Sequence, residues 1–200
     1  MQKIILIVCA MRKEAIRIAE KMELEIIDEN TYRKNNITLL ITGIGKQKTA
    51  IALTQYLCNN LKPDLIINIG YAGSTDIEIG KWVNINNVYN YEWNIPGEER
   101  FSMSDFENKK LILLKNKNLI IAPCYSAEAF VTKTDINESV VFDMELHSIA
   151  IICDINNIDL FALKKISDNL SLENYYENIN MKDVFELESF LDYIEYMQIL

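Results

Sequence analysis

The chain has 200 residues, of which 50% are hydrophobic and 24% are charged, with a formal net charge of −9 at pH 7. This length supports one hydrophobic core, so we expect a single domain over 1–200. The acidic balance argues against nucleic acid or an anionic membrane surface as a partner. Residues 1–10 lack the basic start and cleavage site of a signal peptide, and no apolar run reaches membrane-spanning length. We therefore expect a cytoplasmic protein.

Branched apolar runs alternate with helical patterns in the first third of the chain. The spacing predicts buried strands at 3–10, 37–42 and 64–70, with helices at 14–22 and 46–61 between them. A strand–helix–strand–helix–strand order is typical of an α/β fold built on a largely parallel sheet.

The remaining elements follow a less regular order. In chain order we expect long strands at 81–93, strands at 119–122 and 139–142, a helix at 144–156, a strand at 160–167, a flexible polar loop at 169–180 and a closing helix at 184–197. No internal repeat or low-complexity linker interrupts the chain.

The cysteines give no sign of a disulfide framework or a metal site. Cys9, Cys58, Cys124 and Cys153 are far apart, form no Cys-x-x-Cys pair and have apolar neighbours, which favours buried, reduced thiols. His147 is the only histidine, which argues against a structural zinc site. Its apolar surroundings favour a packed side chain, and we expect no metal or other cofactor.

Acidic residues follow several apolar runs, at positions where ligands bind in open α/β sheets. Glu14, Glu145 and Asp168 each lie just beyond such a run. A single acid there is commonly a helix cap or turn residue, and Asp143 fits that interpretation for the helix holding His147. Three acids on one rim would raise each other's pKa values and suit acid–base chemistry. Periodicity alone does not show that they converge.

Glycines 43, 45, 70 and 73 follow the second and third predicted strands. They are consistent with tight turns, and equally with close approach of the backbone to a ligand at a helix N-terminus. Neither segment has the spacing of a phosphate-binding Walker loop, and Gly-x-Gly-x-x-Gly is absent. Binding of a nucleoside triphosphate or a dinucleotide is therefore not supported.

The ordered set of strand-end motifs resembles the nucleoside phosphorylase superfamily, most closely its methylthioadenosine/S-adenosylhomocysteine nucleosidase branch. The motifs that carry the resemblance are 10–14, 42–46, 63–74, 79–83, 142–145 and 166–168. Between 88 and 122 the chain is shorter than the family. The resemblance implies one α/β domain whose central mixed sheet is partly closed like a barrel and flanked by helices, and a homodimer.

The resemblance also assigns chemical roles. Asp168 would protonate N7 of the purine as the glycosidic bond stretches, so that the base leaves with less negative charge. Glu14 would orient or deprotonate the attacking water. Glu145 would bind the ribose hydroxyls and favour the developing oxocarbenium-like cation.

Further residues would contact the substrate. By resemblance Met144 packs on the ribose, Phe130 stacks on the base, Val131 offers backbone hydrogen bonds, Ile44 borders the 5′ substituent, and Tyr71, Ala72, Gly73, Lys164 and Ser167 complete the pocket. Tyr71 replaces a small residue of the family, and Lys164 replaces an arginine, which keeps the charge but loses the bidentate geometry.

The leading hypothesis is a purine nucleoside N-ribosyl hydrolase that cleaves 5′-thio-substituted adenosines to adenine and the thioribose. A phosphate-dependent phosphorylase of the same superfamily is the first alternative, and a catalytically weak nucleoside-binding protein is the second. The expected partners are a small-molecule nucleoside and a second copy of the chain. The aromatic segment 82–96 is the expected subunit contact, unless its rings fill the chain's own core.

Overall fold

The computed structural model describes residues 3–101, 111–113 and 119–180. The elements within these ranges are β1 (Ile5–Cys9), α1 (Arg12–Lys21), β2 (Glu25–Ile26), β3 (Thr31–Lys34), β4 (Ile37–Ile41), α2 (Lys46–Asn59), β5 (Leu65–Ser74), β6 (Trp82–Asn90), β7 (Ile120–Ser126), β8 (Val141–Asp143), α3 (Leu146–Asn156), β9 (Asp159–Asp168) and α4 (Leu172–Asn180). None of the described helices is long and apolar enough to cross a membrane.

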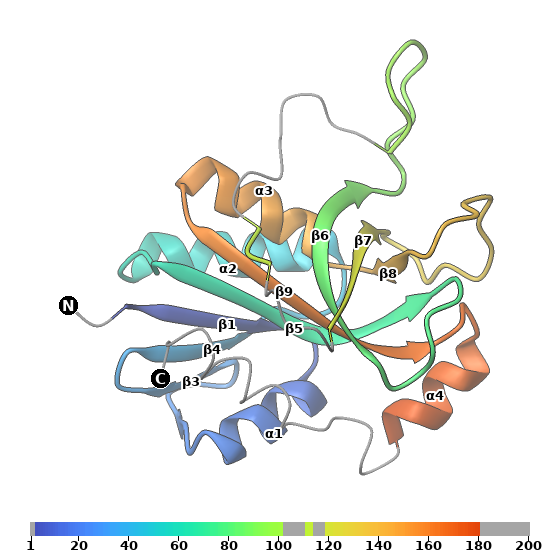
Figure 1. The fold of residues 1–200 in the computed structure, drawn as a ribbon. Helices are drawn as coiled ribbons and strands as arrows, with labels where there is room; N and C mark the ends of the chain where they lie inside the picture. Colours follow the sequence, from blue (N-terminus) through green and yellow to red (C-terminus); the bar gives the residue numbers. More distant parts are fainter. Residues whose placement is uncertain (1–2, 102–110, 114–118, 181–200) are drawn as a thin grey trace.

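The described strands form one mixed sheet in the order β2-β3-β4-β1-β5-β8-β7-β6-β9. An additional pairing of β5 with β9 closes β5, β8, β7, β6 and β9 into a five-stranded barrel (Figure 1). β1 is parallel to β4 and β5, whereas β8 is antiparallel to β5 and β6 is antiparallel to β9. The predicted α/β fold with a mixed, partly barrel-like sheet is confirmed.

Helices cover both faces of the open part of the sheet. α1 packs on one face, and α2 and α3 lie side by side on the other (Figure 1). Successive residues of β1 point to opposite faces, so Ile7 joins the α1 side of the core and Val8 joins the α2–α3 side. This burial of both faces explains why the strand reads as a continuous apolar run.

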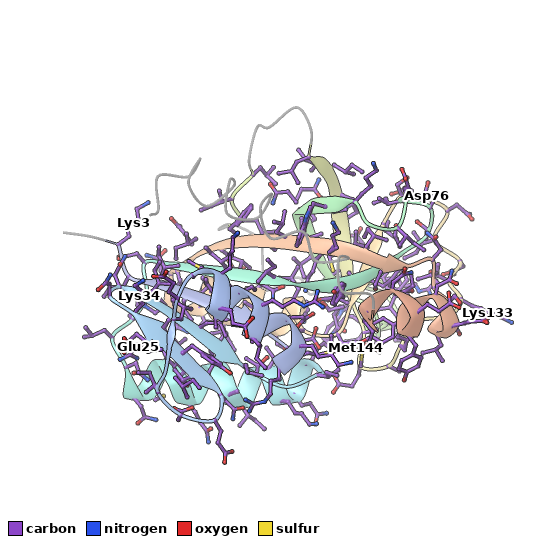
Figure 2. All side chains as sticks on the ribbon, turned by 90° about the horizontal axis from the view of Figure 1, so that it is seen from below. Lys3, Glu25, Lys34, Asp76, Lys133 and Met144 are labelled. Carbon is purple, nitrogen blue, oxygen red and sulfur yellow. The ribbon has the colours of Figure 1, made fainter. Side chains whose placement is uncertain are left out.

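β5 and β9 pair in parallel over almost their whole length, from Leu65 to Gly73 of β5, which fixes the position of the residues at their ends. The register has an irregularity after Ala72, beyond which Gly73 pairs with Asp168. Met144 lies away from Lys3 and Lys34, toward the side of the molecule that carries Lys133 (Figure 2). The motif-bearing segments therefore gather at the end toward which β1, β4, β5 and β9 run.

The prediction of a flexible loop at 169–180 is wrong, because residues Leu172–Asn180 form α4. Tyr175 and Ile179 are spaced four apart and face the body of the protein. The Asn178 side chain donates a hydrogen bond to the carbonyl of Ser167, 2.8 Å away, and ties α4 to the end of β9. The predicted closing helix at 184–197 lies outside the described residues.

The prediction of buried thiols holds for Cys9, Cys124 and Cys153 but is wrong for Cys58, which is exposed. Cys58 is five residues beyond Leu53, the buried centre of α2, and therefore lies on the outer side of that helix. All four are free thiols.

Candidate active site

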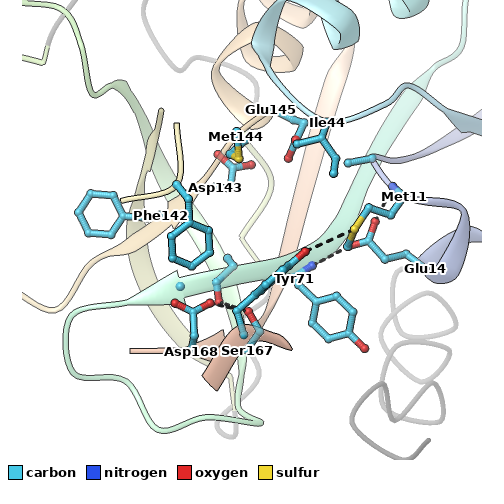
Figure 3. Close-up of a pocket in the computed structure, with 15 residues that line it drawn as sticks. Met11, Glu14, Ile44, Tyr71, Phe142, Asp143, Met144, Glu145, Ser167 and Asp168 are labelled. Carbon is cyan, nitrogen blue, oxygen red and sulfur yellow. Dashed lines mark hydrogen bonds between the residues drawn. The ribbon is translucent and has the colours of Figure 1, made fainter. Parts of the chain in front are cut away.

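A cavity of about 80 Å³ lies where the ends of β5, β8 and β9 meet the start of α1 and the side of α4. It is lined by Ala10, Met11, Glu14, Ile44, Tyr71, Ala72, Gly73, Phe130, Phe142, Asp143, Met144, Glu145, Ser167, Asp168 and Tyr175. An adjoining pocket of about 30 Å³ shares Phe130, Met144 and Asp168 with it and adds Val131. Glu14, Glu145 and Asp168 enter the cavity from different sides (Figure 3).

Asp168 is the last residue of β9. Within the described part of the chain, one of its carboxylate oxygens has a hydrogen-bond partner and the other has none. The Ser167 hydroxyl lies 2.8 Å from Oδ2, whereas Oδ1 is buried and has no hydrogen-bond partner. Burial raises the pKa of Asp168, and the Ser167 hydroxyl opposes that change. A buried carboxyl oxygen without a partner has a high affinity for a proton. Asp168 can therefore act as a general acid.

Glu14, in the first turn of α1, is held by two backbone donors. Oε1 accepts the N–H of Tyr71 and Oε2 accepts the N–H of Met11, both at 2.9 Å. Burial raises the pKa of Glu14, and these two hydrogen bonds oppose that rise without cancelling it. Because both donors favour the ionised form, Glu14 has the environment of a fixed carboxylate base.

Glu145 lies directly before α3 and reaches the N-terminus of α2. Its Oε1 accepts the N–H of Gly45 at 2.9 Å. Burial and the charge of Asp143 raise the pKa of Glu145 to about 8, and Lys164 opposes that rise. A carboxylate at this place also interacts favourably with the positive end of the α2 dipole.

The glycines serve these same carboxylates. Gly43 and Gly45 have φ of +83° and +103°, which only glycine adopts readily, and they shape the turn into α2. A β-carbon on Gly70 would stand 2.9 Å from Glu14 Oε1. The sequence suggested that the backbone at these glycines comes close to a ligand. At Gly70 the group that the backbone approaches is the Glu14 carboxylate.

Lys164 does not line the cavity. Its Nζ lies 2.7 Å from Oδ2 of Asp143, and both side chains are buried. The same oxygen accepts the N–H of Leu146 at 2.9 Å, so Asp143 binds the first amide of α3, but the N-cap residue of that helix is Glu145 and not Asp143 as predicted. The ion pair was not apparent in the sequence, because it depends on the closure of the barrel, in which β8 and β9 both pair with β5.

The other predicted binding residues lie together. Ile44, Tyr71, Ala72, Gly73, Phe130, Met144 and Ser167 line the cavity, and Val131 lines the adjoining pocket. The Tyr71 ring also packs against the core on the α1 face. His147 is buried, as expected of a packed histidine, and burial together with the charge of Lys46 lowers its pKa to about 4.

Sequence reasoning missed one wall of the cavity. Tyr175 of α4 contacts the Phe130 ring edge-on, with centroids 5.5 Å apart, and its hydroxyl lies 3.5 Å from the Met11 sulfur. Ala10, Met11, Phe142 and Asp143 also line the cavity and were not predicted as site residues. The four-residue spacing of Tyr175 and Ile179 was the available signal for α4, but the polar residues around it obscured the pattern.

The charge of the cavity limits its chemistry. Among the described residues that line it, the ionisable groups are carboxyls and tyrosines, and neither lysine nor arginine is present. No group of three or more His, Cys, Asp or Glu side chains suited to a metal ion occurs in the described part of the chain. The arrangement can donate a proton from Asp168, accept one at Glu14 and stabilise a cation between its carboxylates.

Residues 4–186 match the model of the phosphorylase superfamily. A 5′-methylthioadenosine/S-adenosylhomocysteine nucleosidase from Buchnera aphidicola (subsp. Acyrthosiphon pisum, strain Tuc7) is 31% identical over 194 residues, which cover 82% of this chain and 81% of that protein. A Helicobacter pylori nucleosidase mutant with 5′-methylthioadenosine in its active site has a TM-score of 0.78 at 19% identity, covering 98% of this chain and 100% of that one. A Colwellia psychrerythraea nucleosidase in complex with adenine has a TM-score of 0.73 at 18% identity, covering 88% of each chain.

Proposed function

The chain belongs to the phosphorylase superfamily and, within it, to the 5′-methylthioadenosine/S-adenosylhomocysteine nucleosidases, and from this premise we propose the roles of its residues. The enzyme is a nucleosidase that hydrolyses the N-glycosidic bond of 5′-thio-substituted adenosines. Its products are adenine and the thioribose. The observation that carries the assignment is the buried, unbonded Oδ1 of Asp168 in a cavity that also holds Glu14 and Glu145.

Asp168 is the general acid of this scheme. The purine base is a poor leaving group as an anion, and protonation at N7 removes the charge that would build up on it. The burial that raises the pKa of Asp168 keeps the proton available, and its free Oδ1 is the oxygen that delivers it. Ser167 fixes the other oxygen and so sets the direction of delivery.

Glu14 is the base that orients the attacking water. Its two backbone hydrogen bonds hold both oxygens in place and leave each with a lone pair for a water proton. The position of the carboxylate is therefore set before substrate binds, which reduces the entropic cost of the reaction. The proton moves from water to Glu14 as the carbon–oxygen bond forms.

Glu145 and Met144 bind the ribose in our proposal. The Glu145 carboxylate accepts hydrogen bonds from the ribose hydroxyls, and its negative charge stabilises the oxocarbenium-like transition state. Phe130 and the backbone of Val131 hold the purine beside Asp168. Ile44 borders the 5′ substituent.

Hydrolysis is favoured over phosphorolysis by the charge of the cavity. A phosphate dianion in a partly dry site needs cationic donors, preferably a bidentate arginine. The described cavity lining holds no lysine or arginine, and Lys164 is paired with Asp143. Arg12 donates instead to the carbonyl of Glu29 on the surface. Glu14 would repel a phosphate, but it can polarise a water.

The test is to incubate the protein with 5′-methylthioadenosine, S-adenosylhomocysteine, adenosine and inosine in phosphate-free buffer and to separate the products by chromatography. We expect free adenine and the free thioribose, at a rate that added phosphate does not increase. A sugar 1-phosphate, or activity that depends on phosphate, would establish the phosphorylase alternative. Binding without release of base would establish the nucleoside-binding alternative.

We also propose that the enzyme is a cytoplasmic homodimer that works in methionine salvage. Trp82 lies in the chain's own core and the Tyr89 ring stacks on Tyr125, so these two aromatics are used within one chain. Ile51 of α2 and Ile155 of α3 are 61% and 66% exposed on two adjacent helices, and they support an interface there. Light scattering at micromolar concentration should give twice the chain mass, and Ile51→Lys should lower it.

A further inference from the structure

Lys164 and Asp143 form an ion pair that is almost completely removed from solvent. The side chains are 2% and 0% exposed, and their charged atoms are 2.7 Å apart. Burying two charges costs much of what their attraction returns, so such a pair adds little stability compared with apolar packing. Asp143 lines the cavity whereas Lys164 lies behind it, so the ion pair connects the core to the site.

The pair is connected to the backbone at the start of α3. Asp143 Oδ2 accepts the N–H of Leu146 at 2.9 Å, and Oδ1 accepts the Ser126 hydroxyl at 2.5 Å. The Ser126 oxygen in turn accepts the N–H of His147 at 2.8 Å. The same network thereby holds the first two amides of α3, those of Leu146 and His147. Glu145 lies between Leu146 and Asp143, so both sides of it are fixed by this network.

The charge of Lys164 also acts on the carboxylates of the site. The ionisable groups around its ammonium come from five places in the fold: Asp143 at the end of β8, Glu145 before α3, Glu14 on α1, Cys9 on β1 and Cys124 on β7. Although burial opposes it, Lys164 lowers the pKa of Asp143, and it also acts to lower the pKa values of Glu145 and Glu14.

We propose that Lys164 is a positioning residue that acts on Glu145 through Asp143 and the start of α3, without contacting the substrate. The inference rests on the proposed function, in which Glu145 binds the ribose. It replaces the expectation that Lys164 is itself a binding residue. Its positive charge opposes the rise in the pKa of Glu145 and so favours the anionic form that accepts the ribose hydroxyls.

The first experiment compares Lys164→Met with Lys165→Met. Lys165 is the next residue of β9, is equally buried and lies 5.0 Å from the centre of the Trp82 ring on the other face of the strand. It therefore controls for the general cost of losing a buried lysine. The measurement is kcat/KM for 5′-methylthioadenosine and for its 2′-deoxy analogue.

We expect the ratio of the two kcat/KM values to fall about tenfold or more in Lys164→Met, the size of one lost hydrogen bond to a charged acceptor. The ratio should stay within about twofold of wild type in Lys165→Met, and Lys164→Arg should keep most of it. Equal losses in both methionine variants would overturn the proposal, because they would mean a structural role only.

The pH dependence gives a second readout that a structural role would not move. Lys164→Met removes a cation near Glu145 and Glu14, so the acidic limb of kcat/KM should shift to higher pH. Asp143→Asn removes an anion and should shift it to lower pH. Shifts of the same sign would overturn the proposal.

The double variant Lys164→Met/Asp143→Asn leaves no unpaired buried charge, and it is the variant to use if the single one does not fold. It should recover at least half of the lost ribose discrimination, whereas no recovery would mean that Lys164 contacts the substrate directly.

A wild-type protein that releases no adenine would instead contradict the proposed function. The same ratio would then be measured as dissociation constants of the two nucleosides, and an unchanged ratio in Lys164→Met would overturn the inference.

Discussion

Gly73 and Asp168 face each other across the paired ends of β5 and β9, so closely that a β-carbon on Gly73 would stand 2.8 Å from Asp168 Oδ1. Gly70 has the same relation to Glu14, at 2.9 Å. Real β-carbons do not approach polar atoms this closely. Asp168 and Glu14, the two carboxylates that would exchange protons with the reactants, thus each pack against a glycine of β5.

Gly73→Ala should therefore reduce turnover by displacing Asp168, with a fall in kcat of roughly tenfold or more, because a shift of about 1 Å at a reacting group is costly. The control is Gly80→Ala. Gly80 has φ of +87°, and a β-carbon added there would meet no atom within 4 Å, so the substitution strains the backbone without touching the site. It should lower the melting temperature but keep kcat. If the two variants lose kcat equally, the contact with Asp168 is not the cause.

Asp168→Asn should abolish turnover and leave nucleoside binding largely intact. An amide can hold N7 through a hydrogen bond but cannot deliver a proton, and a general acid contributes about 10²–10⁴-fold in rate. Steady-state kinetics and calorimetric titration with 5′-methylthioadenosine measure the two effects separately. Activity above roughly a third of wild type would be inconsistent with the role of Asp168.

Much of the fold could be predicted from the sequence, because its central strands are buried on both faces. β1 is a continuous apolar run, and β5 and the first half of β9 are largely apolar, as expected of strands in a sheet covered on both sides. α4 could not be predicted as readily. Its packing depends on two residues, Tyr175 and Ile179, in a segment of otherwise polar composition.

The site was predictable where its residues end apolar runs, as Glu14 and Asp168 do. Lys164 shows the limit of that approach. It lies inside an apolar run, and the barrel closure that carries β8 close to β9 is a long-range pairing that leaves no local pattern. A lysine in such a run indicates a buried partner, but the sequence does not identify Asp143 as that partner.

Glu145→Gln should weaken activity on ribonucleosides far more than on their 2′-deoxy analogues. A charged acceptor makes a hydrogen bond about twice as strong as a neutral one, and the deoxy substrate lacks one of the donors. The comparison of kcat/KM for the paired substrates measures the difference. Equal losses on both substrates would give Glu145 a purely electrostatic or structural role.

The same variant should change how stability depends on pH. Burial and Asp143 raise the pKa of Glu145 from 4.5 to about 8, so the folded protein binds its proton more tightly than the unfolded chain does. The contribution of Glu145 to the free energy of unfolding of wild type should therefore decrease between about pH 4.5 and 8. Glu145→Gln should remove at least about 1 kcal/mol of that decrease, since one pKa unit is worth about 1.4 kcal/mol. Urea unfolding at pH 5 and pH 8 measures it, and parallel curves for the two proteins would contradict the assignment.

Tyr175 should affect substrate binding more than chemistry, because it closes the cavity without touching Asp168 or Glu14 through a hydrogen bond. Its ring contacts Phe130, and an aromatic pair is worth about 0.5–1.5 kcal/mol beyond the area it buries. Tyr175→Ala should therefore raise KM about tenfold and change kcat by less than about threefold. Tyr175→Phe keeps the ring and loses only the weak hydroxyl contact with the Met11 sulfur, so it should stay within about twofold of wild type.

The matched control is Tyr176→Ala, since this neighbouring ring is 59% exposed and does not line the cavity. A fall in kcat with unchanged KM in Tyr175→Ala would instead place the tyrosine in the chemical step.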